Sequence, residues 1–167
     1  WETLHSISVG GVGVHVTELA AGLQRRGHEV HVFTRPGAGQ APVETIHGVT
    51  YHRCGFQLSP NFVDEINSMC RSFVHHFFRH EDATGRFDIV HAHDWLASNA
   101  AVWIKEGRAR KAVVTMHSTE YGRNGNKHFA GQAARVTDHE RHGTFCADRV
   151  ITVSGLLRDE VSWLYQL

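Results

Sequence analysis

Residues 10–34 read GGVGVHVTELAAGLQRRGHEVHVFT: a glycine-rich start, an amphipathic stretch and then an alternating apolar one. Val16, Leu19 and Leu23 recur at the three- and four-residue spacing of one helix face. Gly27 follows and favours a helix end, because glycine adopts left-handed backbone angles without strain. The alternation after it predicts a strand. A helix that begins after the glycines, from Gly13, and passes directly into a strand is therefore the first structural unit.

The alternation of helix and strand continues along the chain. Further strands are predicted from apolar runs at 47–54, 87–92, 111–116 and 149–153. Further helices are predicted after Pro60, from Trp95 to Glu106, from Phe129 to Phe145 and after Ser154. Strands that alternate with helices imply right-handed parallel crossovers. The expected fold is α/β: a Rossmann-like open parallel sheet with helices on both faces. A glycine loop before a helix normally follows a strand, so the first strand is expected upstream of this chain.

Single residues predict several local features. Pro60 suits the first position of a helix, and Asp94 and Ser154 are expected to cap the helices that follow them. Residues 117–128 are expected to form a polar loop. A solvated helix face is expected for His75, His76 and His80.

Composition narrows the class of protein. The 167 residues, 41% of them hydrophobic, suit one domain with a buried core. Seventeen basic and 17 acidic residues cancel, which gives no overall field for nucleic acid or an anionic membrane. The three cysteines, Cys54, Cys70 and Cys146, form no C-x-x-C pair, which argues against a disulfide framework and fits a cytoplasmic location. No apolar run is long enough for a membrane span, and no targeting segment is expected.

The glycine-rich start allows two interpretations. Gly10 and Gly11 could let a phosphate approach the first turn of the helix, or they could serve a tight turn with no ligand. A dinucleotide fingerprint is incomplete, because Val16 stands where its third glycine should be. The following strand also lacks the acid that holds an adenosine ribose, although Arg35 keeps NADP open.

Residues 91–95, His-Ala-His-Asp-Trp, are the sharpest polar cluster and lie at the end of the strand predicted at 87–92. His91 and His93 share one strand face. A zinc site would need further ligands, and neither His117 nor the pair His139 and His142 stands at a recognised spacing, so no metal is expected.

A carbohydrate site is the alternative interpretation. The carboxylate of Asp94 could accept hydrogen bonds from sugar hydroxyls, and the indole of Trp95 could stack on a pyranose. The simpler interpretation makes Asp94 a helix cap and Trp95 a core residue. Residues 117–126 follow the next strand and are dense in hydroxyl-binding and phosphate-binding groups, which favours a functional loop. The topology predicts that these segments meet at one edge of the sheet.

Five segments, taken in order, resemble the retaining glycosyltransferases of the glycogen and starch synthase kind, which have the GT-B fold. The matching segments are 10–20, 26–30, 91–95, 114–117 and 147–154. The resemblance spans nearly the whole chain. It implies that residues 1–167 are the N-terminal, acceptor-side Rossmann-like domain of such an enzyme, here incomplete and without its C-terminal donor-binding domain.

The resemblance also implies roles for particular residues. Gly10 and Gly11 would face the donor diphosphate, and His117 would lie beside the transferred sugar. The acceptor side would be formed by His93, Asp94, Trp95, Glu120, Tyr121 and Arg123. Two departures bear on specificity: the loop 118–126 departs from the Asn that often follows the histidine, and Ser8-Val9 stands where a lysine often precedes the glycines.

The implied activity is retaining transfer of a glucosyl unit from ADP- or UDP-glucose to an α-glucan, without metal or cofactor. The catalytic charges would come from the C-terminal domain, so this fragment alone is expected to be inactive. The alternatives are a glycosyltransferase for another acceptor, a noncatalytic glycan-binding module, and an NADP-dependent oxidoreductase or a metal hydrolase. The expected partners are the nucleotide-sugar, a glucan or oligosaccharide acceptor and the protein's own C-terminal domain.

Overall fold

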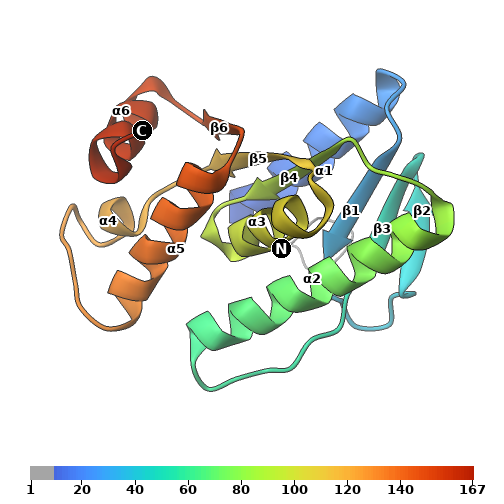
Figure 1. The fold of residues 1–167 in the computed structure, drawn as a ribbon, viewed down its shortest axis with the longest axis horizontal. Coiled ribbons are helices and arrows are strands. Elements are labelled where there is room, and N and C mark those ends of the chain that lie inside the picture. Colours follow the sequence, from blue (N-terminus) through green and yellow to red (C-terminus); the bar gives the residue numbers. More distant parts are fainter. Residues whose placement is uncertain (1–9) are drawn as a thin grey trace.

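The computed structural model describes residues 10–167, in which helices and strands alternate (Figure 1). The helices are α1 (Gly10–Arg25), α2 (Phe62–Thr84), α3 (Trp95–Arg108), α4 (Glu120–Arg123), α5 (Gln132–Cys146) and α6 (Gly155–Tyr165). The strands are β1 (Val30–Thr34), β2 (Val43–Ile46), β3 (Val49–Arg53), β4 (Ile89–His93), β5 (Lys111–Met116) and β6 (Arg149–Thr152). The strand expected before Gly10 concerns a part of the chain outside the described residues.

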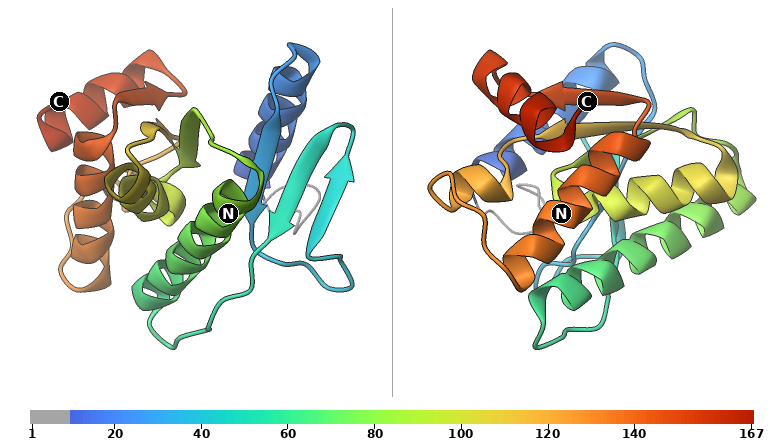
Figure 2. Two further views of the ribbon diagram at one scale, coloured as in Figure 1. Left: turned by 45° about the vertical axis from the view of Figure 1, so that its right-hand side comes forward. Right: turned by 60° about the vertical axis from the view of Figure 1, so that its left-hand side comes forward.

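The described strands form two three-stranded sheets, in the orders β1-β3-β2 and β4-β5-β6. All pairs are parallel except β2 with β3, and the turned views in Figure 2 separate the two sheets. Residues 43–46, for which the sequence predicted no element, form β2, and its antiparallel pairing with β3 departs from the expected parallel sheet. The turn between β2 and β3 has positive φ at both His47 and Gly48, the geometry that joins antiparallel strands through two residues.

Helices cover the strands on both sides, as the α/β prediction requires. In Figure 1, α2 crosses in front of β1 and β3, whereas α1 lies behind them. Helix α3 contacts β4 and β5, and it also packs on α2 and α5. Buried apolar side chains of α2 and α3, including Met69 and Phe73, form one core cluster, and those of β5 and α6, including Val114 and Val161, form another.

The starts of α1 and α2 differ from the sequence prediction, whereas the start of α6 agrees with it. Helix α1 begins at Gly10, so the glycine-rich segment forms its first turn and is not a loop before it. Helix α2 begins at Phe62 and not at Pro60, because the Asn61 side chain accepts hydrogen bonds of 3.1 and 3.3 Å from backbone N–H groups of the first turn. The Ser154 side chain caps α6, which confirms that prediction.

Three further corrections concern the segment after β5, the start of α5 and the surroundings of His80. The segment 117–128 is not entirely loop, since it contains α4, and α5 begins at Gln132, three residues after the predicted start. His80 does not lie on a solvated face with its neighbours, because its ring packs against those of His31 and His52 at centroid distances of 4.5 and 4.9 Å.

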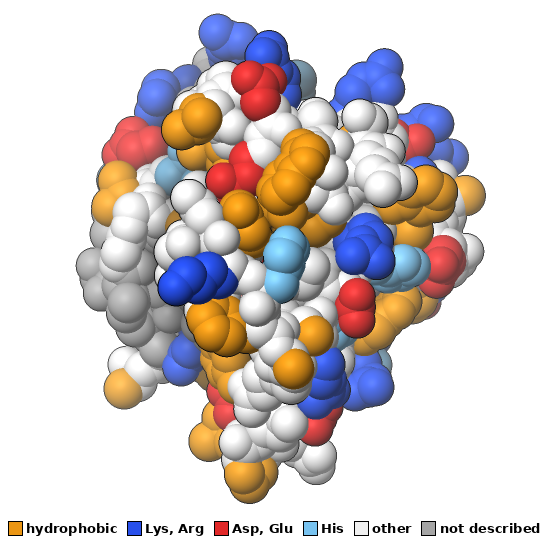
Figure 3. Space-filling view, turned by 90° about the vertical axis from the view of Figure 1, so that its left-hand side faces the viewer, with side chains coloured by type: hydrophobic (Ala, Val, Ile, Leu, Met, Phe, Trp, Pro, Cys, Tyr) orange, Lys and Arg blue, Asp and Glu red, His pale blue; other side chains and the backbone are white. Residues whose placement is uncertain are grey.

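Charges are mixed on the surface. Figure 3 shows the face formed mainly by α4, α5 and α6, where basic and acidic side chains are interspersed among apolar ones. Leu156 and Trp163 on α6 are 82% and 64% exposed. Among the described residues, no helix combines the length and the apolar character that crossing a membrane requires.

Candidate functional site

The ends of β4 and β5 bring three predicted site residues together. His93 pairs in register with Thr115, so the residues after both strands start at the same sheet edge. His93 Nδ1 and His117 Nε2 are 3.1 Å apart. The His117 backbone N–H donates a 2.7 Å hydrogen bond to Oδ1 of Asp94. The predicted meeting of these two segments at one edge is confirmed.

A third imidazole, which the sequence pattern alone did not single out, comes from α1. The ring of His15 lies edge-on to those of His93 and His117, with centroid distances of 5.4 and 4.8 Å. One ring nitrogen of each histidine lies within 4.8 Å of the others. The sequence contained one signal for His15, its place within the first turns of a helix that begins with glycines. The amino ends of such helices point to the carboxyl ends of the strands.

Gly10 and Gly11 lie exposed in the first turn of α1. A Cβ at either position would meet no described atom within 4 Å. The positive φ of Gly10, +72°, explains the glycine there. Gly11 has no such conformational reason and no packing reason within the described residues, so close approach of a ligand stays the prediction for it.

Asp94 occupies the N-cap position of α3, but its side chain does not cap the helix as the sequence predicted. Its side chain makes no capping hydrogen bond to α3 and turns to the segment after β5, where His117 donates to it. The residue is 6% exposed and has φ +56°, a backbone conformation that L-residues rarely adopt. Burial raises the pKa of its carboxyl, against the lowering by backbone N–H donors of His117 and Ser118. A strained, buried carboxylate at a sheet edge is typical of a built site.

Trp95 is 5% exposed and packs against Phe62 and His139, with centroid distances of 5.6 and 6.0 Å. This burial leaves no indole face for a sugar and agrees with the simpler interpretation of Trp95 as a core residue. Its contribution to the site is to hold the start of α3, and with it Asp94, in place.

The segment after His117 is held by a buried carboxylate that the sequence analysis missed. Glu140 on α5 has a side chain that is 0% exposed, and it accepts hydrogen bonds from the Glu120 backbone N–H, the Arg123 guanidinium and the Tyr165 hydroxyl. Burial raises the pKa of the Glu140 carboxyl, and those hydrogen bonds lower it. No local pattern marks Glu140, because its partners are 17 to 25 residues away in the sequence.

The three predicted loop residues have different surroundings. Arg123 bridges Glu120 and Glu140 with hydrogen bonds of 2.8 Å, so these charges first stabilise the loop itself. The Tyr121 ring lies against His128 and Trp163 at 4.8 and 5.5 Å. The structure therefore joins Glu120 and Arg123 in one ion-paired group and places Tyr121 in an aromatic group beside it.

The histidines at the sheet edge are held neutral. Burial, together with neighbouring imidazoles, lowers the pKa of His91 to about 4 and that of His93 to about 2. Burial also lowers the pKa of His117, which the Asp94 carboxylate opposes. Neutral imidazoles offer one donor and one acceptor each, which suits hydroxyl groups.

The lowered pKa of His91 predicts a pH-dependent stability. The folded-state pKa, about 4, lies below the ordinary value of 6.5, so the unfolded chain binds the proton first. The contribution of neutral His91 to the free energy of unfolding is fully present above pH 6.5 and is lost as the pH falls from 6.5 toward 4. Thermal unfolding from pH 7.5 to 4.5 should show a smaller loss of Tm for His91→Gln than for the wild type. Parallel Tm profiles of the two proteins would contradict this assignment.

Which histidines lie close enough together to share a metal ion depends on the tertiary structure and could not be predicted from spacing in the sequence. Among residues 10–167, two groups of three histidines bring their ligand atoms within 4.8 Å: His15 with His93 and His117, and His31 with His52 and His80. The other candidates from the sequence have different partners. His91 Nε2 lies 2.7 Å from the Thr115 hydroxyl, and His139 Nδ1 lies 2.6 Å from the Asn99 amide.

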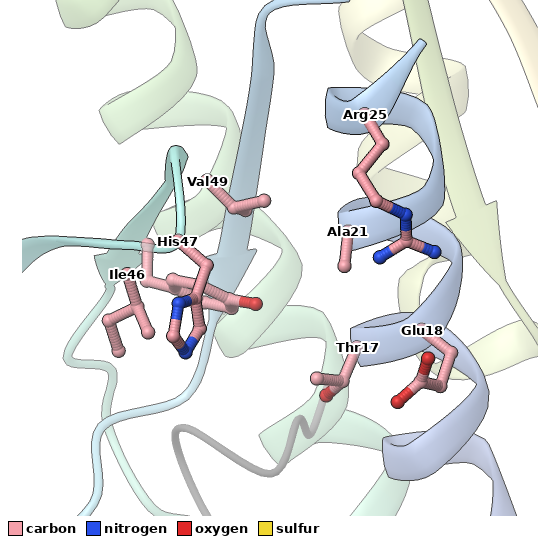
Figure 4. A pocket seen from close by; sticks show the side chains of 8 residues that line it. Thr17, Glu18, Ala21, Arg25, Ile46, His47 and Val49 are labelled. Atoms are coloured by element: carbon pink, nitrogen blue, oxygen red, sulfur yellow. The ribbon is translucent and has the colours of Figure 1, made fainter.

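A cavity of about 310 Å³ lies away from the sheet-edge histidines, between α1 and the β2–β3 hairpin. Figure 4 shows Thr17, Glu18 and Arg25 on the α1 side and His47 on the hairpin side. None of the residues predicted for donor or acceptor lines it.

Comparison with known proteins finds relatives of this chain. The chain is 31% identical over 162 residues to an uncharacterized glycosyltransferase of Methanocaldococcus jannaschii, covering 94% of this chain and 39% of that protein. It is 27% identical to a glycogen synthase of Mycobacterium tuberculosis (95% and 42% covered). It is 31% identical to a D-inositol 3-phosphate glycosyltransferase of Kineococcus radiotolerans (93% and 38% covered). The chain thus spans about two fifths of the length of these relatives.

A solved structure shows the same fold. Sucrose-phosphate synthase from Thermosynechococcus elongatus superimposes with a TM-score of 0.76 at 20% identity, over 95% of this chain and 41% of that one. The family model described as a glycosyl transferase 4-like domain matches residues 10–166. Sequence, fold and the order of the segments at the sheet edge agree: the chain belongs to the glycosyl transferase 4-like domain family of GT-B glycosyltransferases.

Proposed function

We propose that this chain is the acceptor-side domain of a retaining glycosyltransferase that moves a glucosyl unit from ADP- or UDP-glucose to an α-glucan. The observation that carries the proposal is the convergence of His15, His93, Asp94 and His117 at the carboxyl ends of β4 and β5. In open α/β sheets, ligands bind outside the carboxyl ends of the strands.

The chemistry of these groups suits a sugar and its diphosphate. Neutral His93 and His117 offer donors and acceptors to hydroxyl groups, and the Asp94 carboxylate accepts from them. The first turn of α1, with Gly10 and Gly11 exposed, offers backbone N–H groups and the positive end of the helix dipole to phosphate. His117 is assigned to the transferred sugar, and His93 and Asp94 to the acceptor.

Several parts of the proposal concern the protein beyond this chain. The relatives are more than twice as long as this chain, which supports a second, donor-binding domain that completes the cleft. The charges that stabilise the departing nucleotide are assigned to that domain, so residues 1–167 alone are expected to be inactive. We assign no metal or cofactor to the transfer itself, and we place the protein in the cytoplasm.

The decisive experiment assays the full-length protein with ADP-glucose and UDP-glucose against glycogen, maltooligosaccharides and D-inositol 3-phosphate. Transfer to glycogen or maltooligosaccharides, with retention at the anomeric carbon, is the expected result. D-Inositol 3-phosphate belongs in the panel because a relative named for that acceptor is 31% identical. Transfer to D-inositol 3-phosphate alone would show that the acceptor is a small phosphorylated molecule and not a glucan. Glycan binding without any turnover of the donor would show that the protein is a glycan-binding module and not an enzyme.

A further inference from the structure

The second histidine group lies outside the proposed sugar site. His31 is the second residue of β1, His52 lies in β3 and His80 in the last turns of α2. Phe87 packs on this group and precedes β4, whereas the sugar site follows the end of β4. The two groups therefore lie toward opposite ends of the strands. No step of the proposed transfer uses His31, His52 or His80.

Sheet register and helix packing hold the three rings together. Phe33 pairs with His52 across parallel strands, so His52 lies on the same sheet face as Phe33 and His31, two residues apart on β1. Helix α2 covers this face and adds His80. Phe33 stacks on His52 at 4.5 Å, and Phe87 stacks on His80 at 5.4 Å. Aromatic packing thus fixes two of the three imidazole planes before any ligand binds.

The distances suit a shared cation. One nitrogen from each ring lies within 4.8 Å of the others. His31 Nδ1 and His52 Nε2 are 2.9 Å apart. Two nitrogens that bind one tetrahedral Zn²⁺ at its usual bond length lie about 3.3 Å apart, so ring movements of a few tenths of an ångström to about an ångström would close the site.

Glu29 supplies a second, independent feature of a metal centre. Its Oε1 lies 3.0 Å from His31 Nε2, on the ring edge opposite the contact with His52. A carboxylate that accepts the outer N–H of a histidine fixes the tautomer in which the inner nitrogen carries no proton, so His31 Nδ1 is the acceptor in its contact with His52 Nε2. The side chain of His31 is only 7% exposed, whereas that of Glu29 is 85% exposed, so the carboxylate reaches inward from the surface.

We propose that His31, His52 and His80 bind one divalent transition-metal ion, with Zn²⁺ as the best match, and that Glu29 orients His31. Imidazole nitrogen is a ligand that Zn²⁺, Cu²⁺ and Ni²⁺ favour over Mg²⁺ or Ca²⁺. The ion would join the C-terminal part of α2 to β1 and β3, and it would stabilise this packing without taking part in the transfer.

The test uses the full-length protein, stripped with a chelator and dialysed against Zn²⁺ alone. The wild type is expected to bind one more Zn²⁺ per chain than His80→Gln, and Zn²⁺ should raise the Tm of the wild type by more than that of His80→Gln. Glu29→Gln should weaken this Zn²⁺ site about 10- to 100-fold. His75→Gln is the matched control, because it changes an exposed histidine of the same helix and should leave the binding unchanged.

Cobalt distinguishes this group from the one at the sheet edge. Co²⁺ bound by three imidazoles should give visible absorption bands that His80→Gln loses and His117→Gln keeps. Equal Zn²⁺ stoichiometry and affinity in the wild type, His80→Gln and Glu29→Gln would overturn the proposal. So would loss of the bands in His117→Gln alone. Glu29 is exposed, so its variant keeps the test valid if His80→Gln folds poorly.

Discussion

Replacement of His117 by alanine is expected to lower kcat/KM of the full-length enzyme for the nucleotide-sugar about 100- to 1,000-fold, the usual effect of losing one preorganised donor at a reacting group. The imidazole is held 3.1 Å from His93, and its backbone N–H is fixed by Asp94, so it is positioned before substrate binds. Steady-state kinetics with the best donor and acceptor from the substrate panel measure the change.

A matched variant separates this effect from a general loss of structure. His142→Ala removes an exposed histidine of α5, whose ring nitrogen contacts only the Cys146 sulfur among the described hydrogen bonds, and it should keep wild-type kinetics. The Tm of His117→Ala should remain near that of the wild type, since its side chain is half-buried and not in a core cluster. Unchanged turnover in His117→Ala would remove its assignment to the transferred sugar.

Replacement of Glu140 by glutamine is expected to lower the free energy of unfolding of the chain by about 3 kcal/mol, the low end for breaking a buried ion pair. Three donors meet this carboxylate: the Glu120 N–H, Arg123 and the Tyr165 hydroxyl. A glutamine has one oxygen for them and turns an NH₂ group toward the remaining donors. The low end applies because Arg123 is 35% exposed and keeps its pair with Glu120. Urea unfolding followed by circular dichroism measures the loss.

The control for that measurement is Glu106→Gln, which alters an exposed glutamate of α3 and should change the free energy of unfolding by no more than about 0.5 kcal/mol. Because Glu140 fixes the backbone of α4, Glu140→Gln should also raise KM for the acceptor in the full-length enzyme. A free energy of unfolding equal to that of the wild type would mean that the hydrogen bonds to Glu140 make no net contribution to stability. The conformation of the loop after β5 would then depend on other contacts.

The alternating pattern predicted most of the fold, because the spacing of apolar residues that marks a helix or a strand is a local property of the sequence. The spacing of Val16, Leu19 and Leu23 and the apolar runs at 111–116 and 149–153 correspond to α1, β5 and β6. Local capping succeeded for Ser154, whose hydroxyl accepts from the Leu157 N–H of α6, and failed for Asp94, whose carboxylate accepts from the His117 N–H across the sheet edge. β2 escaped prediction because it is a short exposed edge strand that exists only by pairing with β3.

The sequence by itself determined the α/β class, the family resemblance and the placement of His93, Asp94 and His117 after neighbouring strands, since these depend on order and spacing along the chain. Only the tertiary structure decided that His15 joins them, that Glu140 holds the loop after β5, and that His31, His52 and His80 form a second group. These contacts join residues that are 17 or more positions apart, and nothing in local spacing encodes which distant side chains the packing of helix on sheet will bring together.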